Sequence, residues 1–226
     1  MTQRLVLRPA PGLHHPRATG LSRLGDVAAY GAAPLWALQS LIWVVAPKVQ
    51  EQSAPFHITN AVMFVLVWSS IAGAVALSAA AAARMPHTVN APPSRASRGA
   101  TVLAGSSLTM ATIGLVCILL APLPWAQEVA ISAMTNMLNG AAVLLAASLC
   151  ISAFICARLE GLPFGTTVCA TSLAAGTIAI IVAIVASGTQ SMVGLYFGVS
   201  VAAFNAVAWF LWAKMPWTAG RRRSPA

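Results

Sequence analysis

The chain has 226 residues, of which 58% are apolar and only 8% are charged, and its formal net charge at pH 7 is +9. Soluble domains carry about 25% charged residues, so this composition cannot cover a water-exposed surface. The basic residues are spread between apolar runs instead of forming one patch, which argues against a nucleic-acid partner. The composition therefore excludes a soluble globular domain and predicts an all-α, polytopic integral membrane protein.

The first segment, residues 1–25, is polar, interrupted by prolines and rich in arginine. It lacks the apolar core of a secretory signal peptide, so the sequence predicts a disordered basic tail. Six apolar runs follow, each long enough to supply the ~20 residues with which a helix crosses ~30 Å of hydrocarbon. The predicted membrane-spanning helices are residues 27–46, 58–83, 100–121, 129–157, 166–187 and 192–213. We therefore expect three parts: the tail at 1–25, a six-helix transmembrane domain at 26–216, and a basic tail at 217–226.

The positions of lysine and arginine predict how the helices are oriented. If both termini are cytoplasmic, every one of the 13 basic residues except Lys48 falls in a cytoplasmic segment. An excess of basic residues in cytoplasmic segments is the usual topology signal of membrane proteins. The sequence therefore predicts a multi-pass protein of the cell membrane (inner or plasma membrane), with six spans and both termini cytoplasmic.

A similar pattern ends the second, fourth and sixth apolar runs, where a basic residue is followed shortly by proline. The three pairs are Arg84 and Pro86, Arg158 and Pro163, and Lys214 and Pro216. One interpretation is a helical hairpin that occurs three times. The alternative is that basic residues and proline simply mark the inner ends of spans, because motifs this short recur by chance.

Small residues at four-residue spacing occur in three of the runs, and such residues let helix backbones approach closely in lipid. The stripes are Ser70, Ala74, Ser78 and Ala82, then Ala175, Ala179, Ala183 and Ser187, and finally Gly194, Gly198, Ala202 and Ala206. We expect them to make contacts within the bundle. A homo-oligomer or a partner membrane subunit is the alternative use of such a face.

No Asp, Glu, Lys, Arg or His is expected deep inside a run, and this argues against a transmembrane proton relay or a haem held by paired histidines. No close cluster of His and Cys has the spacing of a metal site. No nucleotide-binding or nucleophile motif is present either. The sequence therefore predicts no cofactor and no metal.

The polar residues that remain inside the runs are neutral amides, namely Gln39, Asn60, Asn136, Asn139 and Asn205. Such amides often form hydrogen bonds between helices. Pro34 frees a backbone carbonyl close to Gln39. The functional interpretation is a ligand-binding pocket, lined by these five amides, for a small apolar or amphipathic molecule.

The expected outer ends of the helices supply a second set of candidates. Glu51 and His57 lie in the first outer segment and Glu128 lies in the second. Carboxylates near a histidine can perform acid–base catalysis, although loop residues are normally solvated.

Three functions follow from these patterns. The first is a membrane protein that binds or translocates a small apolar or amphipathic molecule, alone or as the membrane subunit of a transport complex. The alternative is a small intramembrane enzyme acting on a lipid-soluble, isoprenoid-like or terpenoid-like substrate, with Glu51, His57 and Glu128 as catalytic acid–base residues. A scaffold that docks partner helices is the third. The expected partners are membrane lipid, the small ligand, and a second copy or partner subunit, and the sequence leaves open whether the protein is an enzyme.

Overall fold

The computed structural model describes residues 20–50, 56–84, 95–158, 164–187 and 192–214. Within them all regular secondary structure is helical. The helices are α1 (Gly20–Gln50), α2 (Phe56–Ala82), α4 (Arg95–Leu120), α5 (Gln127–Arg158), α6 (Phe164–Ser187) and α7 (Met192–Lys214). The described residues therefore confirm the all-α prediction. The predicted tail at 217–226, with Arg221, Arg222 and Arg223, lies outside them.

The helices follow the six apolar runs closely and extend beyond most of them. The largest difference is at α1, which begins at Gly20 and so starts inside the segment predicted as a tail at 1–25. Apolar composition marks only the part of a helix that faces hydrocarbon. Backbone hydrogen bonding continues into the polar flank that carries Arg23 and Asp26, where hydropathy gives no signal.

Five of the helices are long and apolar enough to cross a membrane. The qualifying segments are Val27–Val44, Val62–Ala82, Arg95–Leu120, Gln127–Arg158 and Phe197–Lys214. Between 28% and 44% of each segment is buried inside the bundle, and apolar side chains outside this buried part remain exposed. Val102 and Leu119, for example, are 66% and 62% exposed. Exposed apolar surface on this scale requires lipid around it, and the chain is a multi-pass membrane protein.

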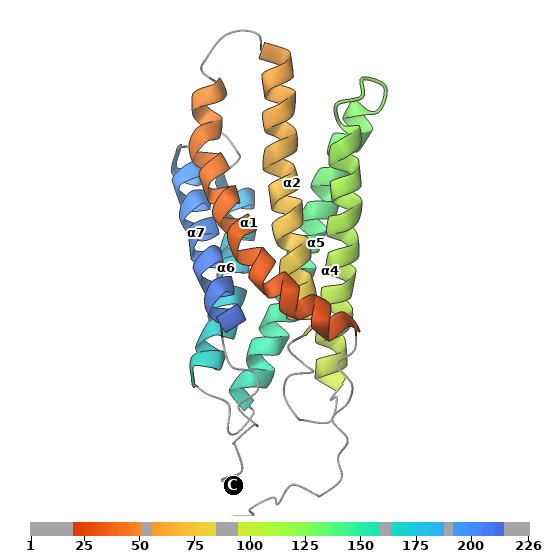
Figure 1. Cartoon of the computed structure of the whole chain (residues 1–226). Coiled ribbons are helices and arrows are strands. Elements are labelled where there is room, and N and C mark those ends of the chain that lie inside the picture. Colours follow the sequence, from red (N-terminus) through yellow and green to blue (C-terminus); the bar gives the residue numbers. More distant parts are fainter. Residues whose placement is uncertain (1–19, 51–55, 85–94, 159–163, 188–191, 215–226) are drawn as a thin grey trace, which may run out of the picture.

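The six described helices lie side by side in one bundle (Figure 1), and their contacts form a closed ring in chain order. Each helix contacts the next along the chain, and α7 returns to contact α1. A further contact between α2 and α5 crosses the middle of the ring. Each of the three predicted hairpins is a contacting pair, but α2–α4 and α5–α6 are contacting pairs as well, so a threefold hairpin repeat stays a prediction.

Small residues make the α1–α2 contact close, as the sequence predicts. All four members of the α2 stripe, Ser70, Ala74, Ser78 and Ala82, are buried. The stripe faces α1, because the indole Nε1 of Trp36 donates a hydrogen bond of 2.9 Å to Ser78 Oγ. On α7, Gly198 contacts the Trp43 ring of α1 and Ala202 is buried. The described members of both stripes therefore serve contacts within the bundle.

The α6 stripe differs from this expectation, since Ala175 is exposed. The buried face of α6 instead contains Cys169, Leu173 and Gly176. Residue size at a fixed spacing shows where backbones can approach, but the direction of the neighbouring helices decides which stripe is used. Use of the Ala175 face for a homo-oligomer stays a prediction.

The α4–α5 hairpin is held by a pair of serine hydroxyls that reach across to the opposite backbone. Ser107 Oγ of α4 donates to the carbonyl of Ala141 at 2.6 Å. Ser148 Oγ of α5 donates to the carbonyl of Ala100 at 2.8 Å. Side chain-to-backbone bonds of this kind require close helix axes, which the alanines on both buried faces allow.

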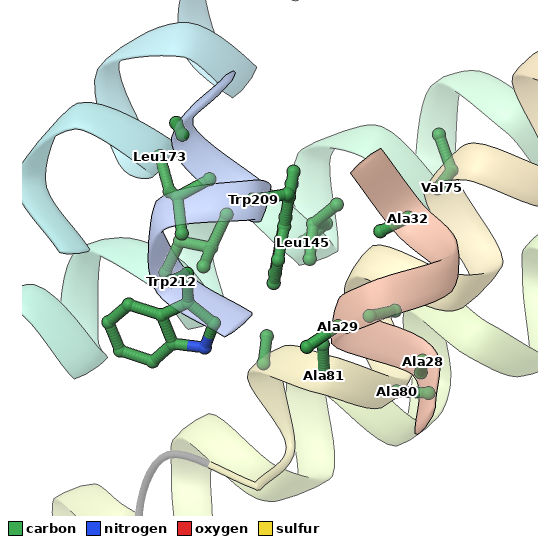
Figure 2. Close-up of a cluster of buried hydrophobic side chains, with 14 of the residues drawn as sticks. Ala28, Ala29, Ala32, Val75, Ala80, Ala81, Leu145, Leu173, Trp209 and Trp212 are labelled. Carbon is green, nitrogen blue, oxygen red and sulfur yellow. The ribbon is translucent and has the colours of Figure 1, made fainter. Parts of the chain in front are cut away.

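Two tryptophans of α7 are buried in the same cluster as the alanines of α1 and α2. Trp209 and Trp212 are each 1% exposed. Figure 2 shows Trp209 near the centre of the cluster, beside Leu145 of α5 and facing Ala29 of α1. Large aromatic rings on one helix thus complement small residues on the others, and this packing fixes the position of α7 in the ring.

Candidate functional site

The predicted pocket residue Gln39 lies on α1, which continues as a helix through Pro34. A proline inside a helix removes one backbone hydrogen bond and bends the axis. Figure 1 shows α1 crossing α2 obliquely in its first half and then turning to run along the bundle. Beyond the bend, Gln39 is 4% exposed, and its Oε1 accepts a hydrogen bond of 2.6 Å from Ser70 Oγ of α2.

The neighbouring face of α1 is directed at α7. Ser40 Oγ donates to the backbone carbonyl of Val199 at 3.1 Å. One turn later the Trp43 ring covers Gly198, where an added Cβ would lie 3.2 Å from Trp43 Cζ3. The Trp43 Nε1 is buried and has no hydrogen-bond partner among the described residues. Polar contacts therefore attach the second half of α1 to both of its neighbours.

Asn205 of α7 is fully buried against α6. Its Nδ2 donates to the carbonyl of Val201 in its own helix at 3.0 Å, while its Oδ1 has no partner among the described residues. The amide fits because Gly176 has no side chain, since an added Cβ there would lie 2.9 Å from Asn205 Nδ2. The Asn205 Oδ1 is therefore a buried acceptor without a donor. Leaving such an oxygen unpaired lowers the stability of the folded protein by about 1–3 kcal/mol.

The other predicted pocket residues are placed differently. Asn136 and Asn139 are exposed on α5, because the buried face of that helix presents Met134 and Leu138. Asn60 belongs to α2, but its side chain lies outside the described residues. Among the described side chains, no two of the five amides form a hydrogen bond with each other. The described residues place Gln39 and Asn205 in separate contacts, and the roles of all five amides in ligand binding stay predictions.

The proposed acid–base residues are not brought together in the described part of the chain. Glu128 is exposed in the first turn of α5, next to the α4–α5 turn that carries the 80% exposed Trp125. Glu51 and the side chain of His57 lie outside the described residues. No distance between these three residues therefore supports the catalytic hypothesis, which stays a prediction.

A groove of about 430 Å³ runs between α6 and α7. Its lining comprises Gly165, Val168, Cys169, Ser172, Phe204, Val207, Ala208, Leu211 and Lys214. The floor is closed by Cys169, whose Sγ donates to the carbonyl of Ala208 at 3.5 Å. The rims are apolar side chains such as Val207 and Leu211, which are 59% and 51% exposed. The groove is therefore open on the outer face of the bundle, where lipid lies.

The groove was not predictable from the sequence. Its signal on α6 is a second series of small residues, Gly165, Cys169 and Ser172, at helical spacing. On α7 the matching face carries large residues, so the groove depends on how the two helices are rotated against each other. That rotation is set by contacts such as Asn205 on Gly176, which a single sequence does not reveal.

Within the described residues there is no group of three or more His, Cys, Asp or Glu side chains that could hold a metal ion. The described geometry is thus that of a multi-pass membrane protein with buried amides and an apolar groove. Comparison of the chain with known protein families, with curated proteins and with solved structures found no match.

Proposed function

We propose that the protein crosses the cell membrane six times, with both termini cytoplasmic, and binds a small apolar or amphipathic molecule in the groove between α6 and α7. The observation that carries the binding proposal is the groove itself, because ligand sites are typically concave, largely apolar and about 300–1,000 Å³ in volume. Its volume of about 430 Å³ falls within this range.

The helix that brings the number of spans from five to six is α6, the fifth described helix in chain order, and its position supports the count. It has 24 residues and no charged side chain, which corresponds to about 36 Å of helix against ~30 Å of hydrocarbon. It contacts α5 on one side and α7 on the other. Because α6 packs between two apolar helices that cross the membrane, we expect it to cross the membrane as well.

Basic residues at the described helix ends support the orientation. Arg84 follows α2, Arg95 begins α4, and Arg158 and Lys214 end α5 and α7. In Figure 1 these helix ends lie at the lower end of the bundle, opposite the α4–α5 turn. Basic residues are retained on the cytoplasmic side, so this end of the bundle would be cytoplasmic.

The topology is tested with reporters placed in two segments. Green fluorescent protein inserted at residues 85–94 should fluoresce, and alkaline phosphatase inserted at residues 121–126 should be active, because the first reporter functions in the cytoplasm and the second outside it. The reporters are also exchanged between the two segments, and phosphatase that is active at 85–94 together with green fluorescent protein that fluoresces at 121–126 would contradict the proposed orientation.

The shape of the groove indicates how a ligand would enter. Its rims are exposed apolar side chains, including Val207 and Leu211. A molecule dissolved in the bilayer can therefore enter sideways, without crossing water. Transport stays a prediction of the sequence analysis, because binding alone does not move a molecule across the membrane. No described contact favours the enzyme alternative, and we do not adopt it.

Filling the groove should abolish binding. We expect Ser172→Phe to reduce the amount of co-purified ligand at least tenfold, which corresponds to about 1.4 kcal/mol, because the new ring occupies the space between Cys169 and Phe204. The matched control is Thr171→Phe, since Thr171 is exposed on the same turn of α6 and does not line the groove. The measurement is mass spectrometry of molecules that co-purify with the protein in mild detergent. A wild-type protein that retains nothing, or a Ser172→Phe variant that retains as much as wild type, would refute the proposal.

A further inference from the structure

Lys214 is the one charged side chain in the described lining of the groove. It is the last residue of α7, it is exposed, and its Nζ lies 5.4 Å from the ring centre of Phe210, one turn earlier on the same helix. A cation over an aromatic ring is held by a weak attraction, which restricts the side chain without covering it. The groove thus has a positive charge at one end and apolar walls along the rest of its length.

The length of the groove matches one leaflet of a bilayer. Its lining on α7 extends from Phe204 to Lys214, which is roughly 15 Å at the rise of an α-helix. This is about half of the ~30 Å hydrocarbon thickness. A chain lying in the groove would therefore begin at the interface, beside Lys214, and end near the middle of the membrane.

The thiol at the floor is already in use. The Cys169 thiol donates to the Ala208 carbonyl, so that contact offers little to a polar ligand. A ligand that suits these walls is apolar along its length and carries its polar part at one end. The charge of Lys214 then selects an acidic head group over a neutral or zwitterionic one, and a basic residue near a membrane surface is worth about a fivefold preference for anionic lipid.

We infer that the groove between α6 and α7 binds an anionic phospholipid of the cytoplasmic leaflet, with one acyl chain between the helices and the phosphate against Lys214. This inference rests on the proposed function, because it names the ligand class of the same groove. It commits to a membrane phospholipid as the occupant, since the groove opens on the lipid-facing surface and its charged end lies at the end of a span.

The test is lipid selectivity in mild detergent. Purified protein is incubated with equal amounts of phosphatidylglycerol and phosphatidylcholine carrying the same acyl chains, and the bound lipids are quantified by native mass spectrometry. Wild type should bind the anionic lipid about fivefold more than the zwitterionic one. Lys214→Gln should bind a similar total amount of lipid without this preference, because the apolar walls are unchanged.

Arg158→Gln is the matched control, because Arg158 also ends a helix and its guanidinium lies 4.5 Å from the ring centre of Phe154, yet it does not line the groove. This variant should keep the preference. Three results would overturn the inference while leaving the groove a binding site. They are equal binding of the two lipids by wild type, an unchanged preference in Lys214→Gln, and an uncharged molecule or free fatty acid as the tightly bound species. If Ser172→Phe binds as much of both lipids as wild type, the groove is not the lipid site and the inference falls on that result as well. The proposed function fails separately, if wild type retains no molecule of any kind.

Discussion

Replacing Trp209 with alanine is expected to lower the free energy of unfolding by about 3–5 kcal/mol, as for other large-to-small changes at buried aromatic residues. The ring is 1% exposed and lies among Leu145, Leu173 and the alanines of α1 and α2 (Figure 2). Alanine side chains are too short to reorient into a new cavity, and the helices that carry them are already in close contact. Most of the vacated volume should therefore remain empty.

The measurement is unfolding of the purified protein in mixed micelles that contain an increasing fraction of sodium dodecyl sulfate, followed by tryptophan fluorescence or circular dichroism. Trp125→Ala provides the control, because Trp125 is 80% exposed in the α4–α5 turn. Its effect should stay within about 0.5 kcal/mol. Equal losses from the two substitutions would show that loss of a tryptophan, and not loss of packing at α7, determines the result.

The helices themselves were predictable because lipid imposes a simple rule on the chain. A helix satisfies its own backbone, and about 20 apolar residues carry it across the hydrocarbon. Six apolar runs therefore became six described helices, even at Pro34, where a soluble helix would usually end. The parts of the helices that were not predicted are their polar ends, such as the start of α1 at Gly20.

The directions of the side chains were not predictable, and the reason is also physical. In a soluble helix the polar face reveals which side is outside, but in a membrane helix both faces are apolar. Asn136 and Asn139 illustrate the result, since their polarity suggested the interior and they lie on the exposed side of α5. Ala175 on α6 gives the same lesson for a small residue. Only contacts between helices distant in sequence settle these rotations.

The two buried amides show that polarity inside the bundle has more than one use. Gln39 shares its Oε1 with the Ser70 hydroxyl and so contributes to the α1–α2 contact. Asn205 satisfies its Nδ2 within α7 and leaves its Oδ1 unpaired beside Gly176. The first arrangement accounts for a structural role by itself. The second leaves an acceptor beside Gly176, which lies one helical turn along α6 from Ser172 of the groove lining.

Replacing Gly25 with leucine is expected to lower the free energy of unfolding by about 1–3 kcal/mol, the usual cost of overpacking. At the crossing of α1 and α2, a Cβ on residue 25 would lie 2.7 Å from Arg84 Cβ and 3.1 Å from the carbonyl oxygen of Ala80. Neither atom belongs to the far end of a flexible side chain, so the helices themselves must separate. Separation would also expose the buried alanines that follow Ala80 on α2.

A matched substitution on α4 isolates this steric effect, because nothing lies within 4 Å of a Cβ added at Gly105. Gly105→Leu replaces an exposed glycine by an apolar side chain that lipid can solvate, and its effect should stay within about 0.5 kcal/mol. Both variants are compared with wild type in the same micellar unfolding assay. Since leucine is the better helix former at either position, a loss confined to Gly25→Leu measures the contact between α1 and α2 and not helix propensity. A Gly25→Leu variant as stable as wild type would mean that α1 and α2 do not approach this closely in the membrane.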